Sequence, residues 1–189
     1  MRLLLSALTA GVLVLSACGP AATAPTAAPT VAATVAPTPA PTPETKLTFV
    51  ADLKTANEVP AITSPEASCS GRGTFTLDTT KSAAGAITAA TAAFNLTLSG
   101  CPTTTEITLF HIHRGAAGAN GGVVVNSGQT AAAAIKLTTG GTSAAVVKSG
   151  ITVTPELANE IVTGPAGFYF NVHSATHGGG VVRGQLVKG

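Results

Sequence analysis

Four histidines occur in this 189-residue chain, and they fall in two short segments, residues 110–115 and 169–177. The first segment contains His111 and His113, and the second contains His173 and His177. Residues two apart in a β-strand leave the same face, about 6.8 Å apart along it. The first pair can therefore serve one metal ion or one buried polar network.

A metal site is one interpretation of these histidines. Neutral imidazoles bind zinc and copper, and a three-histidine site takes two ligands from one strand and one from a partner strand. If the two segments pair as strands, residues 169, 171 and 173 share one face, and the Gly-rich turn after residue 177 can fold back toward it. The expected ligands for copper or zinc are His111, His113, His173 and His177, with Tyr169 and Asn171 as supporting polar groups.

The other interpretation is structural. Buried polar groups must be hydrogen-bonded, and Asn171 and the imidazoles can satisfy one another and the backbone without an ion. Both interpretations stay open at this point. Glu58 and Arg183, near opposite ends of the chain, are expected to form an ion pair next to these groups rather than a binding site.

Signals for catalysis are weak elsewhere in the chain. There is no obvious pair of catalytic carboxylates, and the serines lie in Gly, Ala and Thr contexts that do not match a nucleophile elbow. The glycine runs at residues 140–141 and 178–180 are interpreted as turns, because no helix and lysine follow them as in a phosphate-binding loop. The sequence therefore favours a non-enzymatic protein.

The amino terminus has the pattern of a bacterial lipoprotein signal peptide. Arg2 precedes an apolar stretch over residues 3–15, and Leu15-Ser16-Ala17-Cys18 matches the cleavage site at which the cysteine is lipidated. The apolar stretch is too short to span a bilayer. We expect removal of residues 1–17 and acyl chains on Cys18 that hold the protein on the extracytoplasmic side of a membrane in the cell envelope. The alternative is an ordinary secretory signal with an incidental cysteine.

Residues 18–45 are expected to form a disordered linker. They are dominated by Ala, Thr, Pro and Val, with no alternation that could define a buried face. Proline favours extended polyproline II conformations, which at about 3.1 Å per residue could reach on the order of 80 Å. A disordered ligand segment or a glycosylated stalk is also compatible with this composition, and each is unfolded.

Residues 46–189 are expected to form one domain. The formal net charge of the chain is +2, without clusters of Lys and Arg, which argues against nucleic acid as a partner. Its expected partners are the lipid bilayer, through Cys18, and an unidentified protein or envelope ligand. Export makes a disulfide between Cys69 and Cys101 the favoured state of these residues, with two buried thiols as the alternative.

Short runs with period-two alternation, separated by turn residues, predict an all-β domain. A short helix is expected over residues 154–162, because Thr154 can cap it and Pro155 suits its first turn. The favoured architecture is an antiparallel Greek-key β-sandwich, with a closed barrel second. The expected strands are residues 47–53, 73–77, 86–98, 106–113, 122–125, 131–137, 142–147, 167–173 and 181–187.

Several motifs in order resemble the CHRD domain, a family named from chordin and common in bacterial secreted proteins. They are Asn57-Glu58-Val59-Pro60, His111-Ile112-His113, Tyr169-Phe170-Asn171-Val172-His173 and Arg183-Gly184-Gln185-Leu186, and the resemblance covers residues 46–188. Phe110, Ser174 and Val181 depart from the family pattern. The resemblance implies no established catalytic activity, so we expect a binding or interaction module.

A weaker local likeness is to Cu/Zn superoxide dismutase, a β-sandwich with a His-x-His pair on one strand. Only the pair at His111 and His113 matches, and likeness of fold does not transfer activity. Metal-dependent chemistry of the superoxide dismutase type is therefore the alternative function.

Overall fold

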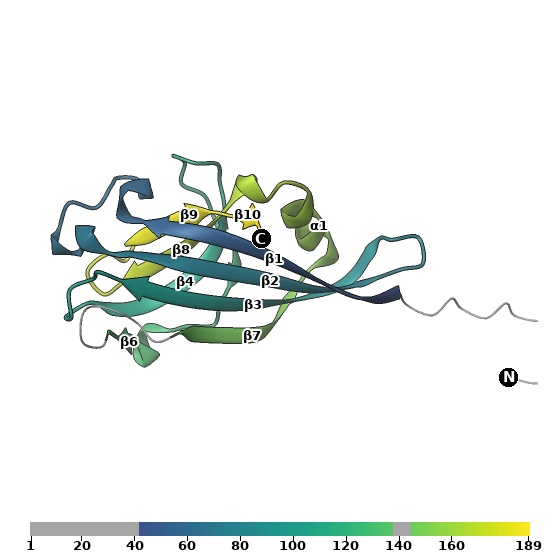
Figure 1. Ribbon diagram of the computed structural model, residues 1–189, viewed down its shortest axis with the longest axis horizontal. Helices are drawn as coiled ribbons and strands as arrows, with labels where there is room; N and C mark the ends of the chain where they lie inside the picture. Colours follow the sequence, from purple (N-terminus) through teal and green to yellow (C-terminus); the bar gives the residue numbers. More distant parts are fainter. Residues whose placement is uncertain (1–41, 138–144) are drawn as a thin grey trace, which may run out of the picture. The chain divides into compact units, whose positions relative to one another are not determined.

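The computed structural model describes residues 42–137 and 145–189 (Figure 1). The predicted signal peptide, Cys18, residues 18–41 of the predicted linker and the turn predicted at residues 140–141 lie outside the described residues. Residues 42–45, predicted as the end of the linker, instead begin the first strand. Within the described part of the chain, no helix is both long enough and apolar enough to cross a membrane.

The described strands form one antiparallel sheet in the order β5-β4-β8-β9-β1-β2-β3-β7, with β10 paired to β1 and β6 paired to β4. The sheet folds over where β9 meets β1, at the pairing of Lys54 with Arg183. The strands are β1 (Thr42–Lys54), β2 (Ser70–Lys81), β3 (Ile87–Ser99), β4 (Glu106–Arg114), β5 (Val123–Asn126), β6 (Ile135–Lys136), β7 (Val146–Val153), β8 (Phe168–Ser174), β9 (Val182–Gln185) and β10 (Val187–Lys188).

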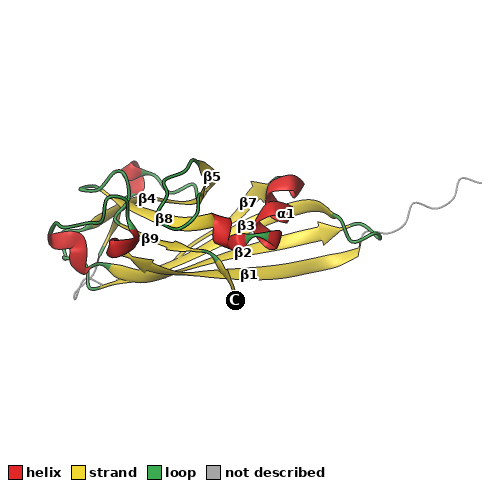
Figure 2. Cartoon of the chain, turned by 90° about the horizontal axis from the view of Figure 1, so that it is seen from above, coloured by secondary structure: helices red, strands yellow, loops and turns green. Residues whose placement is uncertain are grey.

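Two layers enclose the core, one containing β1, β2 and β3 and the other containing β4 and β8 (Figure 2). Phe94 on β3 meets Phe110 on β4 and Phe170 on β8, with ring centroids 5.7 and 5.5 Å apart. Successive strands alternate between the layers here: β4 follows β3 into the second layer, β7 returns to pair with β3 in the first, and β8 pairs with β4 in the second. The predicted antiparallel Greek-key sandwich is confirmed, in a sheet that is nearly closed on itself.

The alternation of buried and more exposed residues accounts for the position of most of these strands in the sheet. In β2, every second residue from Gly73 to Thr79 is buried, and in β3 the buried residues include Phe94, Leu96 and Leu98. The strand β8 differs, because all seven of its residues are buried. One face of β8 packs in the core and the other must therefore be covered by loops, which marks the polar face that carries the candidate site.

The predicted helix and disulfide are confirmed. Helix α1 spans Pro155–Thr163, and the Thr154 hydroxyl accepts a hydrogen bond from the backbone N–H of Leu157. Cys69 and Cys101 form a disulfide that joins the start of β2 to the loop after β3.

Three strand predictions need correction. Residues 131–137 contain a 3₁₀ turn (Ala131–Ala133) before the short β6, because the Gln129 amide donates to the carbonyl oxygen of Ala133 and closes the turn. The strand predicted at 142–147 begins at Val146 and continues to Val153 through an irregularity that includes Gly150, at φ +74°; residues 142–144 lie outside the described residues. The C-terminal prediction, 181–187, is divided into β9 and β10 around the buried Leu186.

Candidate metal centre

The histidine face is the side of β4 and β8 that points away from the core. In the antiparallel register His111 lies opposite Asn171, and His113 lies opposite Tyr169. The alternate residues, including Phe110 and Phe170, are fully buried in the core. The alternation predicted for β8, with its odd-numbered polar residues on one face, is therefore present.

Loops cover this face and are attached to it by hydrogen bonds. The Arg183 side chain donates to the carbonyl oxygens of Asn57, at 2.6 Å, and Ala119, at 3.2 Å. The Asn120 amide joins the same two loops by donating to the carbonyl oxygen of Val59 at 3.0 Å. A third loop, between β8 and β9, receives a hydrogen bond from Asn171 at the Gly179 carbonyl oxygen, 3.4 Å away.

Three histidines meet under these loops. The Nδ1 atom of His111 lies 3.2 Å from the Nε2 atom of His173, and one ring nitrogen from each of His111, His113 and His173 lies within 4.8 Å of the other two. The three side chains are 6 to 8 % exposed. The structure thus brings together the three histidines predicted from the paired strands, close enough to serve as a group that could hold one ion.

Backbone carbonyls fix the tautomers of two of these rings. His113 Nδ1 lies 2.9 Å from the Gly121 carbonyl oxygen, and His173 Nδ1 lies 2.9 Å from the Gly178 carbonyl oxygen. A carbonyl oxygen only accepts, so each Nδ1 carries the proton and each Nε2 carries a lone pair. This orientation by a backbone partner is typical of histidines that bind metal through the opposite nitrogen.

The free nitrogens differ in their partners. The Nε2 atom of His113 is buried without a hydrogen-bond partner among the described residues. The Nε2 atom of His173 accepts a hydrogen bond from His111 Nδ1, since His173 already donates through its other nitrogen. His111 presents the same Nδ1 atom as a lone pair when its proton moves to Nε2. The donor atoms available to an ion are therefore His111 Nδ1, His113 Nε2 and His173 Nε2.

The environment keeps these imidazoles neutral. Burial, followed by the neighbouring His173 and His113, lowers the pKa of His111 to about 4. Burial also lowers the pKa of His113 and of His173, although hydrogen bonds to the carbonyls of Gly121 and Gly178 oppose the shift. The neutral form is the one that ligates a metal ion, so at neutral pH no proton has to be displaced from a charged ring.

Tyr169 and Asn171 border the histidines, as predicted. The Tyr169 ring stacks on His113 with the centroids 4.9 Å apart, and its hydroxyl accepts a hydrogen bond from the Gly121 N–H at 3.1 Å. The Asn171 Oδ1 atom is buried and has no partner among the described residues. Tyr169 thus holds the loop whose carbonyl orients His113.

The predicted pairing of Glu58 with Arg183 is also present. Their Oε2 and Nε atoms lie 3.6 Å apart, and both side chains are buried. The Arg183 guanidinium lies over the Tyr169 ring, 4.9 Å from its centroid. Burial raises the pKa of Glu58 to about 7, against the opposing effects of Arg183 and His177. Glu58 is therefore an incomplete counter-charge for Arg183 near neutral pH.

His177 does not join the other histidines. Its Nδ1 atom lies 2.5 Å from the Oε2 atom of the buried Glu66, which also accepts a hydrogen bond from the Ser174 hydroxyl at 2.7 Å. The turn after β8 does fold back over the histidine face, but the His177 ring pairs with Glu66 in the loop between β1 and β2. Glu66 was not predicted from the sequence, because nothing in its local context points to a partner 111 residues away.

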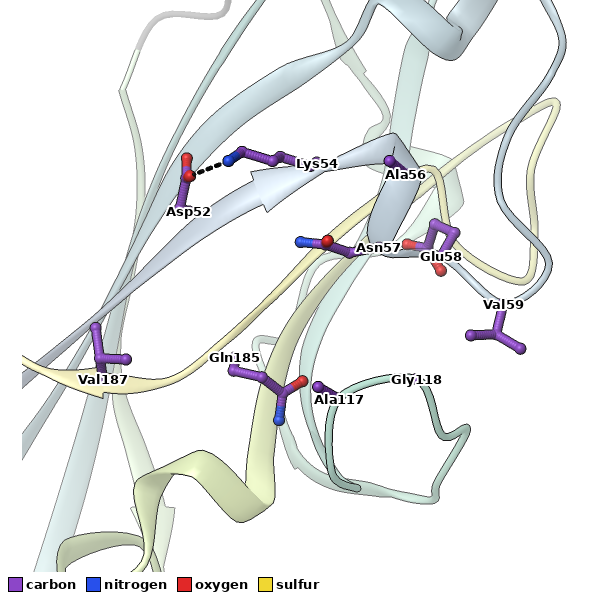
Figure 3. A pocket seen from close by; sticks show the side chains of 10 residues that line it. All are labelled: Asp52, Lys54, Ala56, Asn57, Glu58, Val59, Ala117, Gly118, Gln185 and Val187. Atoms are coloured by element: carbon purple, nitrogen blue, oxygen red, sulfur yellow. Dashed lines mark ion pairs between the residues drawn. The ribbon is translucent and has the colours of Figure 1, made fainter.

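Two surface hollows lie beside the loops, and Glu58 and Val59 line both of them. The larger, of about 450 Å³, is lined also by Asn57, Gln185 and the ion pair of Lys54 with Asp52 (Figure 3). The smaller, of about 310 Å³, lies between Val59 and the turn at residues 176–180. The three clustered histidines line neither hollow, so the loop surface and the histidine cluster are separate features.

Comparison with known families gives one match. The family model described as the CHRD domain matches residues 49–186, from β1 to the residue before β10. No curated protein and no solved structure matches the chain. The match includes all three clustered histidines, both cysteines of the disulfide, and the Glu58 and Arg183 pair.

Proposed function

Because the chain belongs to the CHRD domain family, we propose that it is an exported binding module that holds one transition-metal ion, copper or zinc, through His111, His113 and His173. One observation carries the proposal. Two of the rings are oriented by backbone carbonyls so that their Nε2 atoms face the cluster, and the buried Nε2 atom of His113 has no partner among the described residues.

The distances suit a single ion. Zn–N bonds of about 2.0–2.1 Å in a tetrahedral site place two ligand nitrogens about 3.3 Å apart. His111 Nδ1 and His173 Nε2 are already 3.2 Å apart. The third nitrogen lies within 4.8 Å of both, so a movement on the order of 1 Å would complete the site.

A purely structural hydrogen-bond network accounts for the buried polar atoms of the site less well than a metal ion does. Such a network satisfies its buried polar atoms, because an unpaired buried group costs about 1–3 kcal/mol. His113 Nε2 and Asn171 Oδ1 are both buried without a partner in the described part of the chain. An ion would use the first of these atoms directly, and Asn171 lies opposite His111 in the strand pairing.

A binding role is favoured over catalysis at the ion. A metal-dependent enzyme needs a pocket beside its ligands for the substrate. The two hollows are instead lined by loop residues and by the adjoining ends of strands, with Glu58 and Val59 in both, and none of the three histidines lines either one. We propose that this loop surface is where a protein or envelope ligand binds.

The proposed location is the extracytoplasmic face of a membrane in the cell envelope. Residues 1–17 and Cys18 have the pattern of a lipoprotein signal, and residues 18–45 have the composition of a tether. The disulfide between Cys69 and Cys101 supports export, because disulfides persist in oxidising compartments. Lipid on Cys18 would anchor the module, and the tether would hold it away from the bilayer.

Metal titration of the full chain tests the proposal. The protein is purified without a histidine tag and titrated with zinc and with copper by calorimetry. We expect one ion per chain, and a loss of affinity of at least tenfold in His111→Ala and in His173→Ala. His177→Ala is the matched control, because His177 pairs with Glu66 outside the cluster. Binding that is absent, or that His177→Ala weakens as much as the other variants do, contradicts the proposal.

A further inference from the structure

We infer that the histidine cluster selects Cu(I) over Zn(II). The inference rests on the proposed function, since it names the ion that the same three side chains would hold. It follows from the charge of the donor set, its burial and the cation beside it.

The donors carry no charge. The cluster consists of three imidazoles, and no carboxylate or thiolate belongs to it among the described residues. A dication held there keeps its full double charge, whereas Cu(I) keeps a single one. The cost of burying an ion in a medium of low dielectric constant rises with the square of its charge, and these side chains are only 6 to 8 % exposed. Burial therefore opposes Zn(II) more strongly than Cu(I).

A buried cation close to the cluster, Arg183, adds to this preference. In the sheet, β8 lies between β4 and β9, so the Tyr169 ring receives His113 from one side and Arg183 from the other. The positive charge of Arg183 therefore lies one aromatic ring away from His113, and its field reaches the cluster. The same field repels a bound ion, and it repels a dication twice as strongly as a monocation.

The number of donors points the same way. Zn(II) held by three imidazoles still takes a fourth ligand, a water molecule in catalytic zinc sites, whereas Cu(I) is stable with three ligands. The neighbouring oxygens are weak candidates for a fourth ligand. The Tyr169 hydroxyl already accepts from Gly121, and Asn171 offers an amide oxygen that leaves the charge of a dication unbalanced.

Competition between the two ions tests the inference. The full chain is loaded anaerobically with Cu(I) buffered by bicinchoninate, and Zn(II) is added at pH 8. We expect one Cu(I) per chain, retained when Zn(II) is present in hundredfold excess. Displacement of Cu(I) by equimolar Zn(II), or a chain that binds Zn(II) but not Cu(I), overturns the inference and leaves the proposed metal site intact. Failure to bind either ion overturns the proposed function as well.

A charge variant tests the electrostatic basis. Glu58→Gln removes the negative partner of Arg183 with little change of shape. Because a dication loses twice as much attraction as a monocation, we expect the affinity for Zn(II) to fall at least threefold more than the affinity for Cu(I). Asp78→Asn, the same charge change on β2 in the other layer, is the control and should leave the ratio unchanged. Equal losses for both ions in Glu58→Gln would overturn the electrostatic argument.

Discussion

Two backbone carbonyls, those of Gly121 and Gly178, decide which nitrogens of His113 and His173 remain available. The positions of these carbonyls depend on the loops that carry them, and the Tyr169 hydroxyl holds the loop of Gly121. A substitution that moves a loop should therefore weaken metal binding without touching a ligand. The two glycines differ in how much room surrounds them, and this allows a matched pair of variants.

Gly121→Ala should weaken metal binding, and Gly178→Ala should not. A Cβ atom on Gly121 would lie 1.6 Å from the carbonyl oxygen of Arg114, so the loop must shift away from His113. A Cβ atom on Gly178 would meet nothing within 4 Å. Loss of an orienting partner typically costs 10–100-fold in metal affinity, and we expect a loss in this range for Gly121→Ala. Titration of both variants checks this, and equal affinities would contradict it.

Glu66 should stabilise the fold above about pH 4.5. Burial raises the pKa of its carboxyl group, but hydrogen bonds from Ser174 and His177 outweigh burial, and the pKa lies below its ordinary value of 4.5. A lowered pKa in the folded state means that the stabilisation is fully present above the unfolded-state pKa and is lost as the pH falls through the folded-state pKa.

The Glu66→Gln variant measures this contribution. We expect its free energy of unfolding to be lower than that of the wild type by about 2 kcal/mol at pH 6 to 7, because hydrogen bonds to a charged group contribute about this much. The difference should shrink as the pH falls below 4.5. Denaturant unfolding across this range checks it, and a difference that stays constant with pH would rule out the ionised carboxylate as its cause.

The residues of the site were predictable where period-two alternation applied. The register of β4 and β8 follows from their apolar residues, and it places His111, His113 and His173 together. The partners from loops were not predictable in this way. Glu66 reaches His177 across 111 residues, and the carbonyl of Gly121 has no signature in the residue type. Contacts made by loops depend on tertiary structure that local periodicity does not contain.

At the scale of the elements, the disulfide ties the hairpin of β2 and β3 together at one end. Cys69 precedes β2, and Cys101 follows the turn after β3, at a sequence separation of 32. A link of this length restricts the unfolded chain and stabilises the fold by about 3–4 kcal/mol. We expect the Cys69→Ser, Cys101→Ser double variant to lose this amount in denaturant unfolding. The wild type after reduction should match it, and an unchanged midpoint in both would contradict the assigned role.

Strand predictions succeeded where large apolar residues alternate, as in β2 and β3, and failed where side chains are small. The Ala-rich segment from 131 to 134 has no large residue to bury, so the Gln129 amide can close a turn in place of a strand. In β7, the irregularity at Gly150 interrupts the alternation, although the strand continues beyond it in pairing with β3. The local sequence pattern predicts the conformation poorly where pairing with a neighbouring strand decides it.

The whole protein is proposed to depend on its membrane anchor for location. Cys18→Ser removes the only thiol at the predicted lipidation site, so we expect the variant to move from the membrane fraction to the soluble fraction. Ala17→Ser, which retains the cysteine and a small residue before it, is the control and should stay with the membrane. Detection of both variants in fractionated cells checks the prediction, and a Cys18→Ser protein that remains in the membrane would contradict lipid anchoring.

At the scale of the whole molecule, the family match covers the same part of the chain as the sandwich fold. The CHRD match spans the strands from β1 to β9, and the sandwich brings its separated histidine motifs into one face. The central claim is that this face binds one ion through three specified nitrogens. Its most direct test is a crystal structure of the copper-loaded protein, with the ion located by anomalous diffraction. We predict a single strong peak bonded to His111 Nδ1, His113 Nε2 and His173 Nε2. A peak elsewhere, or no peak between these residues at full copper loading, would contradict the account.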